Sequence, residues 1–504
     1  MSNKLKVMFS THGLVEGDYA YDTDEKGFPS DTVVSKKVIT GQDTGGQVYY
    51  VKALASVRSE YQTDLVTRRV DPRICPQFGG QAKDLGSDIN YTIEEQWHKI
   101  DNQKNRVLRV PTNGNFNFIP KEEIVPQLPE LVDKTFEYYK EKGLLQDIKV
   151  VEGHYRDGML AADMMATKVA QATGTRPVMI VTSHSLGHKK YERNLKDYEA
   201  GKISKEEWAW HGFEERIKHE IFAFNKADII IATSPDEKER LLTKPYNIES
   251  QKIVIIPPGY NSKIFTPKDK EEAKRNFVYK DLNGTEHTVD LRGKKVVSSL
   301  GRVVRDKGFV ELSKTMAEII KKDRNVVYMV SAENNNPVTK ECEQILKDVR
   351  DNVIFLPSLN QTQMAEVYNT SDIFVMSSLN EAFGMVPIEA MGCKTSVVVG
   401  RSGFNDYAHC ADIRIKDQDF TQAIGLYGPS QDVDRWRQQE SIELLLNNDA
   451  LRNQIAENGY NFVRHNLTWE AIAKTKDECV AKVAEAREND AVNVAPVNVN
   501  ERVI

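Results

Sequence analysis

Short runs of apolar, often β-branched residues alternate along this chain with longer stretches of helical periodicity, and this alternation restricts the fold more than any other feature. A strand, a helix and a second strand in that order form the βαβ unit of a parallel sheet. The stretch 47–59, with Val51, Leu54, Ala55 and Val57 expected on its inner face, exemplifies the helical segments. The sequence therefore predicts an α/β protein. The expected strands are 6–10, 62–67, 178–182, 229–233, 296–300, 326–330, 353–356 and 373–376.

The alternation is interrupted in the segment Ile255-Ile256-Pro257-Pro258-Gly259-Tyr260. Its prolines and glycine favour extended or turn backbone, which makes it the best candidate linker. A chain of 504 residues also exceeds what one hydrophobic core usually supports. We therefore expect two Rossmann-like, doubly wound domains, residues 1–258 and 259–470. Residues 471–504 are expected to form a C-terminal helix that packs back on the first domain, and a loose tail from 485, where helical periodicity is lacking.

Composition excludes several classes of function. A formal net charge of -6 gives no basic footprint for nucleic acid. The five cysteines are scattered and odd in number, which argues against a disulfide framework and favours a reducing compartment. The N-terminus enters an expected strand at once, and no run of 18 apolar residues occurs, so we expect neither a signal peptide nor a membrane span. A cytoplasmic protein is the expectation.

Two glutamates, Glu381 and Glu389, stand eight residues apart after the expected strand 373–376. We expect residues 379–383 to form a loop and 384–391 a helix that stops at Gly392. Backbone amides at the start of that helix would bind a diphosphate, while the carboxylates accept hydrogen bonds from sugar hydroxyls. The alternative is an ordinary strand, loop and helix that carries two surface acids.

Two cations, Arg302 and Lys307, follow the expected strand 296–300. Fixed cations at a strand end suit a diphosphate leaving group, because they stabilise the charge that develops on it. The alternative is a salt-bridged loop in which they pair with Asp306. No His-x-His, Asp-x-Asp or Glu-x-x-His cluster offers a metal site. We therefore expect no required cofactor, with Mg²⁺ at most stimulatory.

In the first half, Gly45 and Gly46 open the helical stretch 47–59 and would let a ligand approach backbone amides. The alternative is a plain helix entry capped by Thr44. Further polar residues follow expected strands, where open α/β sheets bind ligands, and cations from separate segments could converge on a phosphate. Each of them taken singly is equally consistent with a solvated surface residue, and His154 and His184 with satisfied buried histidines. These residues are Lys121, His154, Tyr155, Ser185, Lys190 and Arg216.

Taken together, these segments resemble the family 4 retaining glycosyltransferases of GT-B fold, and within them the sucrose-phosphate synthases, with the mannosylfructose-phosphate synthases as close relatives. The resemblance covers most of the chain. The glutamate pair and Arg302/Lys307 are widespread in such transferases, whereas Asp-Thr-Gly-Gly-Gln and His-Ser-Leu-Gly are narrower. The matching segments are 10–18, 43–48, 67–69, 119–123, 153–155, 184–187, 256–259 and 377–392.

The resemblance implies two Rossmann-like domains that face each other across a cleft, the first for the acceptor and the second for a nucleotide sugar. Catalysis would be front-face displacement without a carboxylate nucleophile. The implied catalytic residues are Glu381, His154, Arg302 and Lys307. The implied donor site comprises Gly46, Arg302, Lys307, Glu381, Phe383, Gly384, Met385 and Glu389. The implied acceptor site comprises Gln47, Lys121, Tyr155, Ser185, Lys190 and Arg216.

The implied reaction is hexosyl transfer from a nucleoside diphosphate sugar to fructose 6-phosphate, with UDP-glucose as the favoured donor. GDP-mannose as donor, a phosphate-dependent disaccharide phosphorylase and a non-catalytic sugar-phosphate sensor remain open. The chain departs from its relatives at residues 401–406, where Arg-Ser-Gly-Phe-Asn-Asp replaces a Gly-Gly-Pro-like turn, and it matches poorly as far as about residue 430. No Asp-x-Asp-x-Thr phosphatase segment follows the transferase region, so a separate phosphatase is the expected partner.

Overall fold

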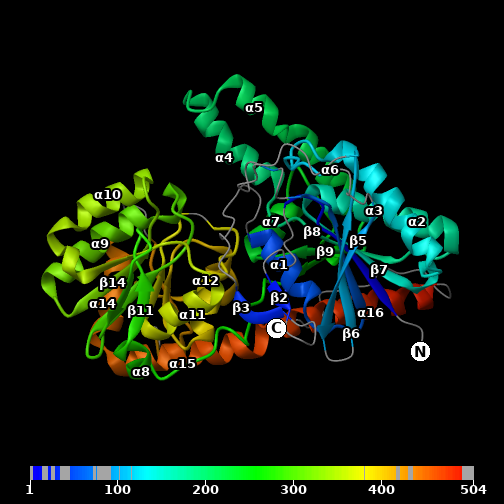
Figure 1. Cartoon of the computed structure of the whole chain (residues 1–504). Helices are drawn as coiled ribbons and strands as arrows, with labels where there is room; N and C mark the ends of the chain where they lie inside the picture. Colours follow the sequence, from blue (N-terminus) through cyan, green and yellow to red (C-terminus); the bar gives the residue numbers. More distant parts are fainter. Residues whose placement is uncertain are drawn as a thin grey trace. The chain divides into compact units, whose positions relative to one another are not determined.

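The computed structural model describes residues 4–13, 21–23, 29–33, 46–71, 75, 92–100, 103–114, 116–379, 381–415, 420–429 and 435–490. The chain divides into two compact units, each built on its own sheet (Figure 1). Unit 1 comprises Met1–Thr233, Glu237–Ile256 and Ala473–Ile504. Unit 2 comprises Ser234–Asp236 and Pro257–Ile472.

The sheet of unit 1 has eight strands in the order β10-β9-β8-β7-β1-β4-β6-β5, and all neighbours are parallel except β5 and β6. Strand β1 pairs with β4 on one side and β7 on the other, so the strand order reverses there. Strands β2 and β3 form a separate antiparallel pair outside this sheet. Their bounds are β1 Leu5–Phe9, β2 Tyr21–Thr23, β3 Pro29–Val33, β4 Gln62–Arg68, β5 Glu94–Ile100, β6 Gln103–Val110, β7 Ile148–His154, β8 Val178–Thr182, β9 Ile229–Ala232 and β10 Ile253–Ile255.

Alternation along the strands gives this sheet two different faces. Leu5, Val7 and Phe9 of β1 join the apolar core made with helices α2, α3 and α6. The intervening residues Lys6 and Met8 point the opposite way, toward α1 and the C-terminal helix α16. The helices of this unit are α1 Gly46–Ala55, α2 Leu128–Glu141, α3 Tyr155–Thr173, α4 Gly187–Glu199, α5 Lys205–His211, α6 Phe213–Lys226 and α7 Pro235–Leu242.

The sheet of unit 2 is parallel throughout, with strand order β15-β14-β13-β16-β17-β19-β18. Its order reverses between β13 and β16, and an antiparallel pair, β11 and β12, stands apart from it. The strands are β11 Phe277–Lys280, β12 Glu286–Val289, β13 Lys295–Ser299, β14 Val326–Ser331, β15 Val353–Leu356, β16 Ile373–Met376, β17 Ser396–Val399, β18 Ala411–Asp412 and β19 Leu426–Tyr427.

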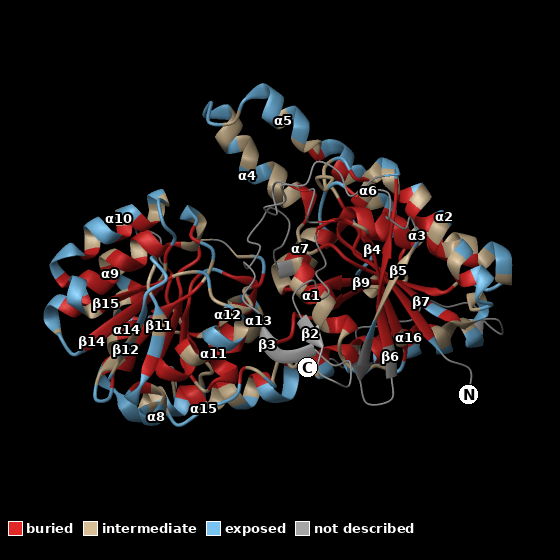
Figure 2. Cartoon of the chain, in the orientation of Figure 1, coloured by how far each residue is buried: buried red, intermediate tan, exposed pale blue. Residues whose placement is uncertain are grey.

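Helices cover the second sheet so that its strands are the most buried part of the unit (Figure 2). The last helix, α16, begins in unit 2 and continues into unit 1. The helices are α8 Lys270–Arg275, α9 Phe309–Lys322, α10 Pro337–Leu346, α11 Gln361–Thr370, α12 Val386–Gly392, α13 Gly403–Ala408, α14 Arg435–Asn447, α15 Asp449–Asn466 and α16 Trp469–Asp490.

The structure confirms the α/β class and corrects three local predictions. The helix expected at 384–391 begins two residues later, at Val386, because Gly384 has a φ of +95° and lies outside helical conformation. Residues 485–490 were expected in a loose tail, but they continue α16, with Arg487 paired to Asp228 at 2.6 Å. Residues 491–504 lie outside the described residues. The strands that the sequence did not predict are β2, β3, β5, β6, β7, β10, β11, β12, β17, β18 and β19.

Candidate functional site

In unit 1, three neighbouring strands, β1, β7 and β8, end at the same edge of the sheet. The strand order reverses at β1 and β7, and open α/β sheets bind ligands at such a point. Tyr155 follows β7 directly, and Ser185 and Lys190 follow β8. The topology therefore brings most of the residues expected from the first half to one edge. Gly46 begins α1 and Gln47 Nε2 lies 3.4 Å from Ser10 Oγ, whereas Thr44, Gly45 and residues 14–18 lie outside the described residues.

Tyr155 is the centre of a cluster of cations. Its buried hydroxyl accepts hydrogen bonds from Lys190 Nζ, at 3.1 Å, and from the guanidinium of Arg216. Arg216 also donates to the carbonyl of Ser185 and, through Nε, to Glu220 at 2.8 Å. Tyr155 has a φ of +62°, a conformation that costs a non-glycine residue about 1–3 kcal/mol. The backbone is thus strained where the cations meet, as is common at binding sites.

The electrostatics of this cluster favour an anion. Burial, with the positive charges of Arg216 and Lys121 acting in the same direction, lowers the pKa of Lys190 to about 7. Glu220 is hydrogen-bonded to Arg216, to the amide of Gly187 and to a tyrosine hydroxyl, so its charge is already engaged. A doubly charged phosphate would relieve the repulsion between Lys190, Arg216 and Lys121, which makes the cluster a phosphate site in chemical terms.

We expect the affinity for a phosphorylated acceptor to fall as the pH rises above 7. Lys190 is protonated below its pKa of about 7 and loses its charge above it, so the free protein then presents one cation fewer. The apparent KM for the acceptor should rise by up to about tenfold per pH unit, because one proton must be taken up on binding. KM measured between pH 6.5 and 9 checks this, and Lys190→Arg, which keeps its charge, should flatten the profile.

His12 and Asp157, which lie near Tyr155, were not among the expected site residues. His12 follows β1, and its Nδ1 lies 2.8 Å from Asp157 Oδ2 on α3, while its ring packs edge-on against Tyr155 with centroids 4.7 Å apart. Thr11 also donates to Asp157. The pair fixes the loop after β1 against the start of α3. A histidine directly after the first strand was the available signal, since ligand sites lie at such strand ends.

His154, expected near the transferred sugar, is fully buried and contacts His184 and Glu152. Its Nδ1 lies 2.9 Å from His184 Nε2, whereas its Nε2 lies 3.0 Å from Glu152 Oε1 without the geometry of a hydrogen bond. Glu152 is the residue before the Gly-His-Tyr segment, and no feature of the sequence singled it out.

In unit 2, the expected donor residues gather where the strand order reverses between β13 and β16. Arg302 and Lys307 follow β13, and Glu381 follows β16. Two hydrogen bonds join these loops: Leu379 N donates to the carbonyl of Asp306 at 2.9 Å, and Ser377 Oγ to that of Lys307 at 2.7 Å.

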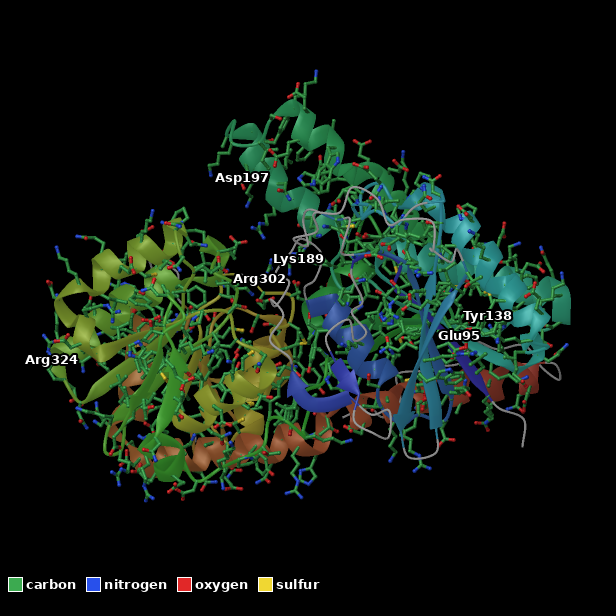
Figure 3. The ribbon with its side chains drawn as sticks, in the orientation of Figure 1. Glu95, Tyr138, Lys189, Asp197, Arg302 and Arg324 are labelled. Carbon is green, nitrogen blue, oxygen red and sulfur yellow. The ribbon has the colours of Figure 1, made fainter. Side chains whose placement is uncertain are left out.

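Lys307 pairs with the carboxylate of Glu381, both side chains being about one-fifth exposed. The expected diphosphate ligand and the expected hexose ligand therefore neutralise each other in the ligand-free protein. Arg302, labelled in Figure 3, is exposed.

Glu389 lies on α12, only 5% exposed, with the hydroxyl of Tyr368 at 3.4 Å as its hydrogen-bond donor. Burial raises the pKa of this carboxyl to about 7, and the Tyr368 hydrogen bond offsets only part of the effect. A buried carboxylate with one weak donor is poised to accept hydrogen bonds from ligand hydroxyls.

Glu389→Gln is expected to stabilise the ligand-free protein at pH 8. The carboxyl ionises near pH 4.5 in the unfolded chain and near 7 in the fold, so stability present below pH 4.5 is lost as the pH rises to 7. The loss is at most about 3 kcal/mol, and an amide of the same shape avoids it. Thermal unfolding should show a higher Tm for the variant at pH 8 and no gain at pH 4.5. An equal gain at both pH values would contradict the assignment.

The turn at 401–406, where the chain departs from its relatives, is built into the glutamate loop. Ser402 Oγ caps α13 by accepting from Asn405 N, and Gly403 N donates to the carbonyl of Glu381 at 3.3 Å. A Cβ on Gly403 would lie 2.1 Å from the carbonyl oxygen of Ala382, so only glycine fits. Phe383 packs its buried ring edge-on against Phe404, and Met385 precedes α12.

Among the described residues, no group of three or more His, Cys, Asp or Glu side chains is arranged to hold a metal ion. Within the same part of the chain, no helix has the length and apolar character needed to cross a bilayer.

Comparison with known proteins agrees with this geometry. Residues 44–263 match the model described as Glycosyltransferase Family 4, and residues 288–462 match Glycosyl transferases group 1. The chain is 29% identical over 369 residues to mannosylfructose-phosphate synthase of Agrobacterium fabrum, covering 71% of each chain. It is 26% identical over 448 residues to a probable sucrose-phosphate synthase of Thermosipho melanesiensis, covering 86% of this chain and 89% of the relative.

Solved structures give the same fold. The sucrose-phosphate synthase of Thermosynechococcus elongatus superposes with a TM-score of 0.63 at 21% identity, covering 97% of this chain and 100% of that one. The catalytic domain of starch synthase IV from Arabidopsis thaliana gives 0.60 at 14% identity, with 96% and 100% covered. The resemblance and the GT-B fold expected from the sequence are thereby confirmed.

Proposed function

We propose that this chain, in which residues 44–263 match Glycosyltransferase Family 4 and residues 288–462 match Glycosyl transferases group 1, transfers a hexosyl group from a nucleoside diphosphate sugar to fructose 6-phosphate with retention of anomeric configuration. The single observation that carries the acceptor is the meeting of Lys190 and Arg216 at the hydroxyl of Tyr155. Arg216 pairs with Glu220 and Lys121 with Glu122, whereas the described ion pairs include none for Lys190. A sugar phosphate would give Lys190 the counter-charge that a neutral sugar does not.

The donor is assigned to unit 2. Glu389, with its spare acceptor capacity, would take the ribose hydroxyls, and Glu381 the hydroxyls of the hexose. Arg302 and Lys307 would hold the diphosphate and stabilise the charge that grows on it as the glycosidic bond breaks. The donor phosphates would draw Lys307 away from Glu381 and free that carboxylate for the sugar. Donor binding thus completes the site.

The reaction would rest on positioning and electrostatics. The hydroxyl of fructose 6-phosphate attacks the anomeric carbon from the side that the diphosphate leaves, and the leaving phosphate oxygen takes up its proton. We propose that no metal is required and that Mg²⁺ at most stimulates, because Arg302 and Lys307 supply the neutralising charge. Equal initial rates with and without a chelator would support this.

Sucrose 6-phosphate, from UDP-glucose, is our favoured product, since relatives named sucrose-phosphate synthase cover most of this chain. GDP-mannose is the second candidate, because mannosylfructose-phosphate synthase is 29% identical. We propose a cytoplasmic setting, and a separate phosphatase to remove the product phosphate.

The test is to incubate purified protein with fructose 6-phosphate and one of UDP-glucose, ADP-glucose or GDP-mannose. Release of nucleoside diphosphate with one donor, together with a phosphorylated disaccharide detected by its mass, would support the proposal and identify the donor. Disaccharide cleavage by inorganic phosphate without nucleotide would identify a phosphorylase instead. Donor binding without turnover would favour a sensor, whose resting state the Lys307–Glu381 pair would suit.

A further inference from the structure

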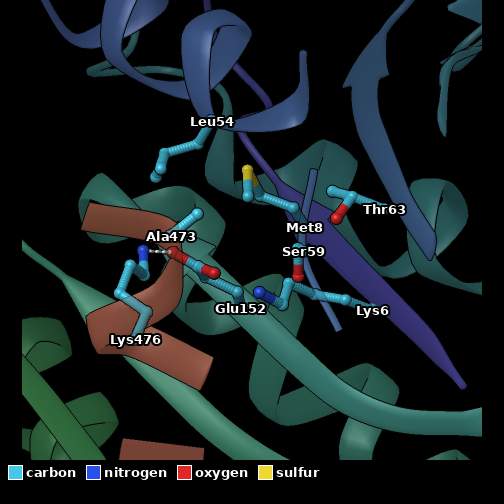
Figure 4. Close-up of a pocket in the computed structure, with 8 residues that line it drawn as sticks. All are labelled: Lys6, Met8, Leu54, Ser59, Thr63, Glu152, Ala473 and Lys476. Carbon is cyan, nitrogen blue, oxygen red and sulfur yellow. Dashed lines mark hydrogen bonds and ion pairs between the residues drawn. The ribbon is translucent and has the colours of Figure 1, made fainter. Parts of the chain in front are cut away.

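A row of polar side chains crosses unit 1 from helix α16 to the carboxyl end of β8. Lys476 on α16, 1% exposed, pairs with the fully buried carboxylate of Glu152 on β7 (Figure 4). Glu152 Oε1 lies 3.0 Å from His154 Nε2 at the end of β7. His154 Nδ1 in turn lies 2.9 Å from His184 Nε2. Lys476 and Glu152 are 324 positions apart in the sequence. The row thus connects α16 with the sheet edge that carries the candidate acceptor site.

The charges in this row determine where its protons lie. Burial opposes ionisation of Glu152, but Lys476 and His154 hold the pKa of its carboxyl well below the usual range, so it is a carboxylate. Burial lowers the pKa of both His154 and His184, so both imidazoles are neutral near pH 7. The contact between His154 Nε2 and Glu152 is short but bent, and it acts mainly through charge.

A lone pair facing a carboxylate would be repelled, so His154 must turn an Nε2–H toward Glu152. Its Nδ1 then has no proton and can only accept, which requires His184 to donate through Nε2–H. A neutral His184 protonated at Nε2 has no proton on Nδ1. The carboxylate at one end of the row therefore sets the tautomer of the imidazole at the other end.

The surroundings hold this arrangement in place. The ring of Tyr50 packs edge-on against both imidazoles, with centroids 5.7 Å from His154 and 4.8 Å from His184. His184 has a φ of +56°, a conformation that a non-glycine residue keeps only where its neighbours enforce it. A cavity of about 10 Å³, the lower limit for one water, borders Glu152 and is lined by Lys6, Met8, Leu54, Ser59, Thr63, Ala473 and Lys476 as well (Figure 4).

We propose that Lys476, Glu152 and His154 are positioning residues that hold His184 as a neutral Nε2–H imidazole, and that its bare Nδ1 accepts a hydrogen bond from a hydroxyl of the bound sugar. His184 is partly exposed and directly precedes Ser185, whose carbonyl binds Arg216 of the cation cluster. Helix α16 thereby contributes to the site without touching substrate. The hydrogen bond between His184 and the sugar rests on the proposed function, whereas the assignment of the tautomers does not.

Imidazole ¹⁵N spectra of the ligand-free protein test the tautomers directly, with assignments for the ten histidines taken from His154→Gln and His184→Gln. We expect both histidines to carry the proton on Nε2. In Glu152→Gln the carboxamide can donate to His154 Nε2, so His154 should shift to the Nδ1–H tautomer and donate to His184 Nε2, which moves the proton of His184 to its Nδ1. Should this variant fold poorly, the charge-neutral double variant Lys476→Met/Glu152→Gln removes the same carboxylate without leaving Lys476 unpaired.

The matched control is Lys6→Met/Asp477→Asn. It removes a second buried pair, 3.0 Å apart, which joins β1 to the same helix beside the cavity that borders Glu152. The hydrogen bonds described for this pair join Lys6 to Asp477 and the amide of Glu60 to Asp477. Both histidines should keep their tautomers there. Unchanged tautomers in Glu152→Gln, or an equal change in the control, would overturn the proposal.

Nucleoside diphosphate release from the nucleotide sugar that turns over with fructose 6-phosphate gives the kinetic readout. Glu152→Gln should lower kcat by about tenfold to a hundredfold, with the KM for the sugar phosphate changed far less. A tautomer change with unaltered kcat would overturn the contact between His184 and the sugar. If the wild-type protein turns over no donor, the proposed function fails while the spectra still decide the tautomers.

Discussion

Glu381→Gln is expected to lower kcat by at least about a hundredfold with every acceptor, because it removes a charged contact to the donor hexose at the reacting centre. Nucleoside diphosphate itself should bind no more weakly than to the wild type. Lys307 loses its only carboxylate partner among the described ion pairs and becomes available to the phosphates. Steady-state rates and calorimetric titration with UDP, ADP or GDP check the two halves of this prediction.

Glu341→Gln is the matched control, because it breaks an exposed ion pair with Arg305 in the same loop as Lys307. Such pairs contribute little, so rate and affinity should stay close to wild type. Weaker diphosphate binding in Glu381→Gln would contradict this prediction. It would mean that the Lys307–Glu381 pair keeps the loop in the conformation that binds diphosphate, instead of keeping Lys307 from the phosphates.

Lys190→Ala should behave differently. It should weaken the binding of a phosphorylated acceptor without a comparable loss of kcat. A hydrogen bond from a charged group contributes about 1.5–3 kcal/mol, so the KM for fructose 6-phosphate should rise by roughly 10-fold to 150-fold. The rate with unphosphorylated fructose, however small, should not change, because the proposed contact of the missing ammonium group is with the phosphate and not with the sugar. Initial rates across acceptor concentrations at pH 6.5, where Lys190 is charged, give both parameters.

Lys196→Ala controls for the loss of a lysine from helix α4, since Lys196 is exposed on the same helix. It should leave KM unchanged. An unaltered KM in Lys190→Ala would instead show that the acceptor phosphate does not bind at the Tyr155 cluster. The argument for a phosphorylated acceptor would then fail.

The strands that the sequence predicted well are short, buried and apolar throughout, as in 353–356 and 373–376, whose bounds agree with β15 and β16. Strand β7 escaped prediction because it ends Glu152-Gly153-His154 and buries polar groups, which breaks the apolar pattern. Strands β5 and β6 at the sheet edge are rich in charge, with Arg106 bonded to Asp64, Glu95 and Tyr138. Tertiary partners satisfy these charges, and a local pattern cannot name them.

The candidate site divides in the same way. Residues in loops after strands, such as Lys190 and Glu381, were found because the topology of a doubly wound sheet fixes where such loops gather. The pairing of Lys307 with Glu381, and of Lys476 with Glu152, depends on side-chain geometry across 74 and 324 positions. The hydrogen-bonding of residues 401–406 to the glutamate loop was likewise invisible in the sequence, where they stood only as a departure from the family pattern.

Helix α16 has a consequence for biosynthesis. Its first turn packs within unit 2, where Trp469 meets Gly259, and its later turns supply Lys476, Asp477 and Arg487 to unit 1. The ribosome makes these residues after the other described parts of both units, so unit 1 lacks these partners until translation has passed residue 487. An unpaired buried charge costs about 3–5 kcal/mol, a large part of the stability of a domain. The first domain to be synthesised is therefore expected to be the last to reach its native state, and a fragment ending at residue 256 should not fold alone.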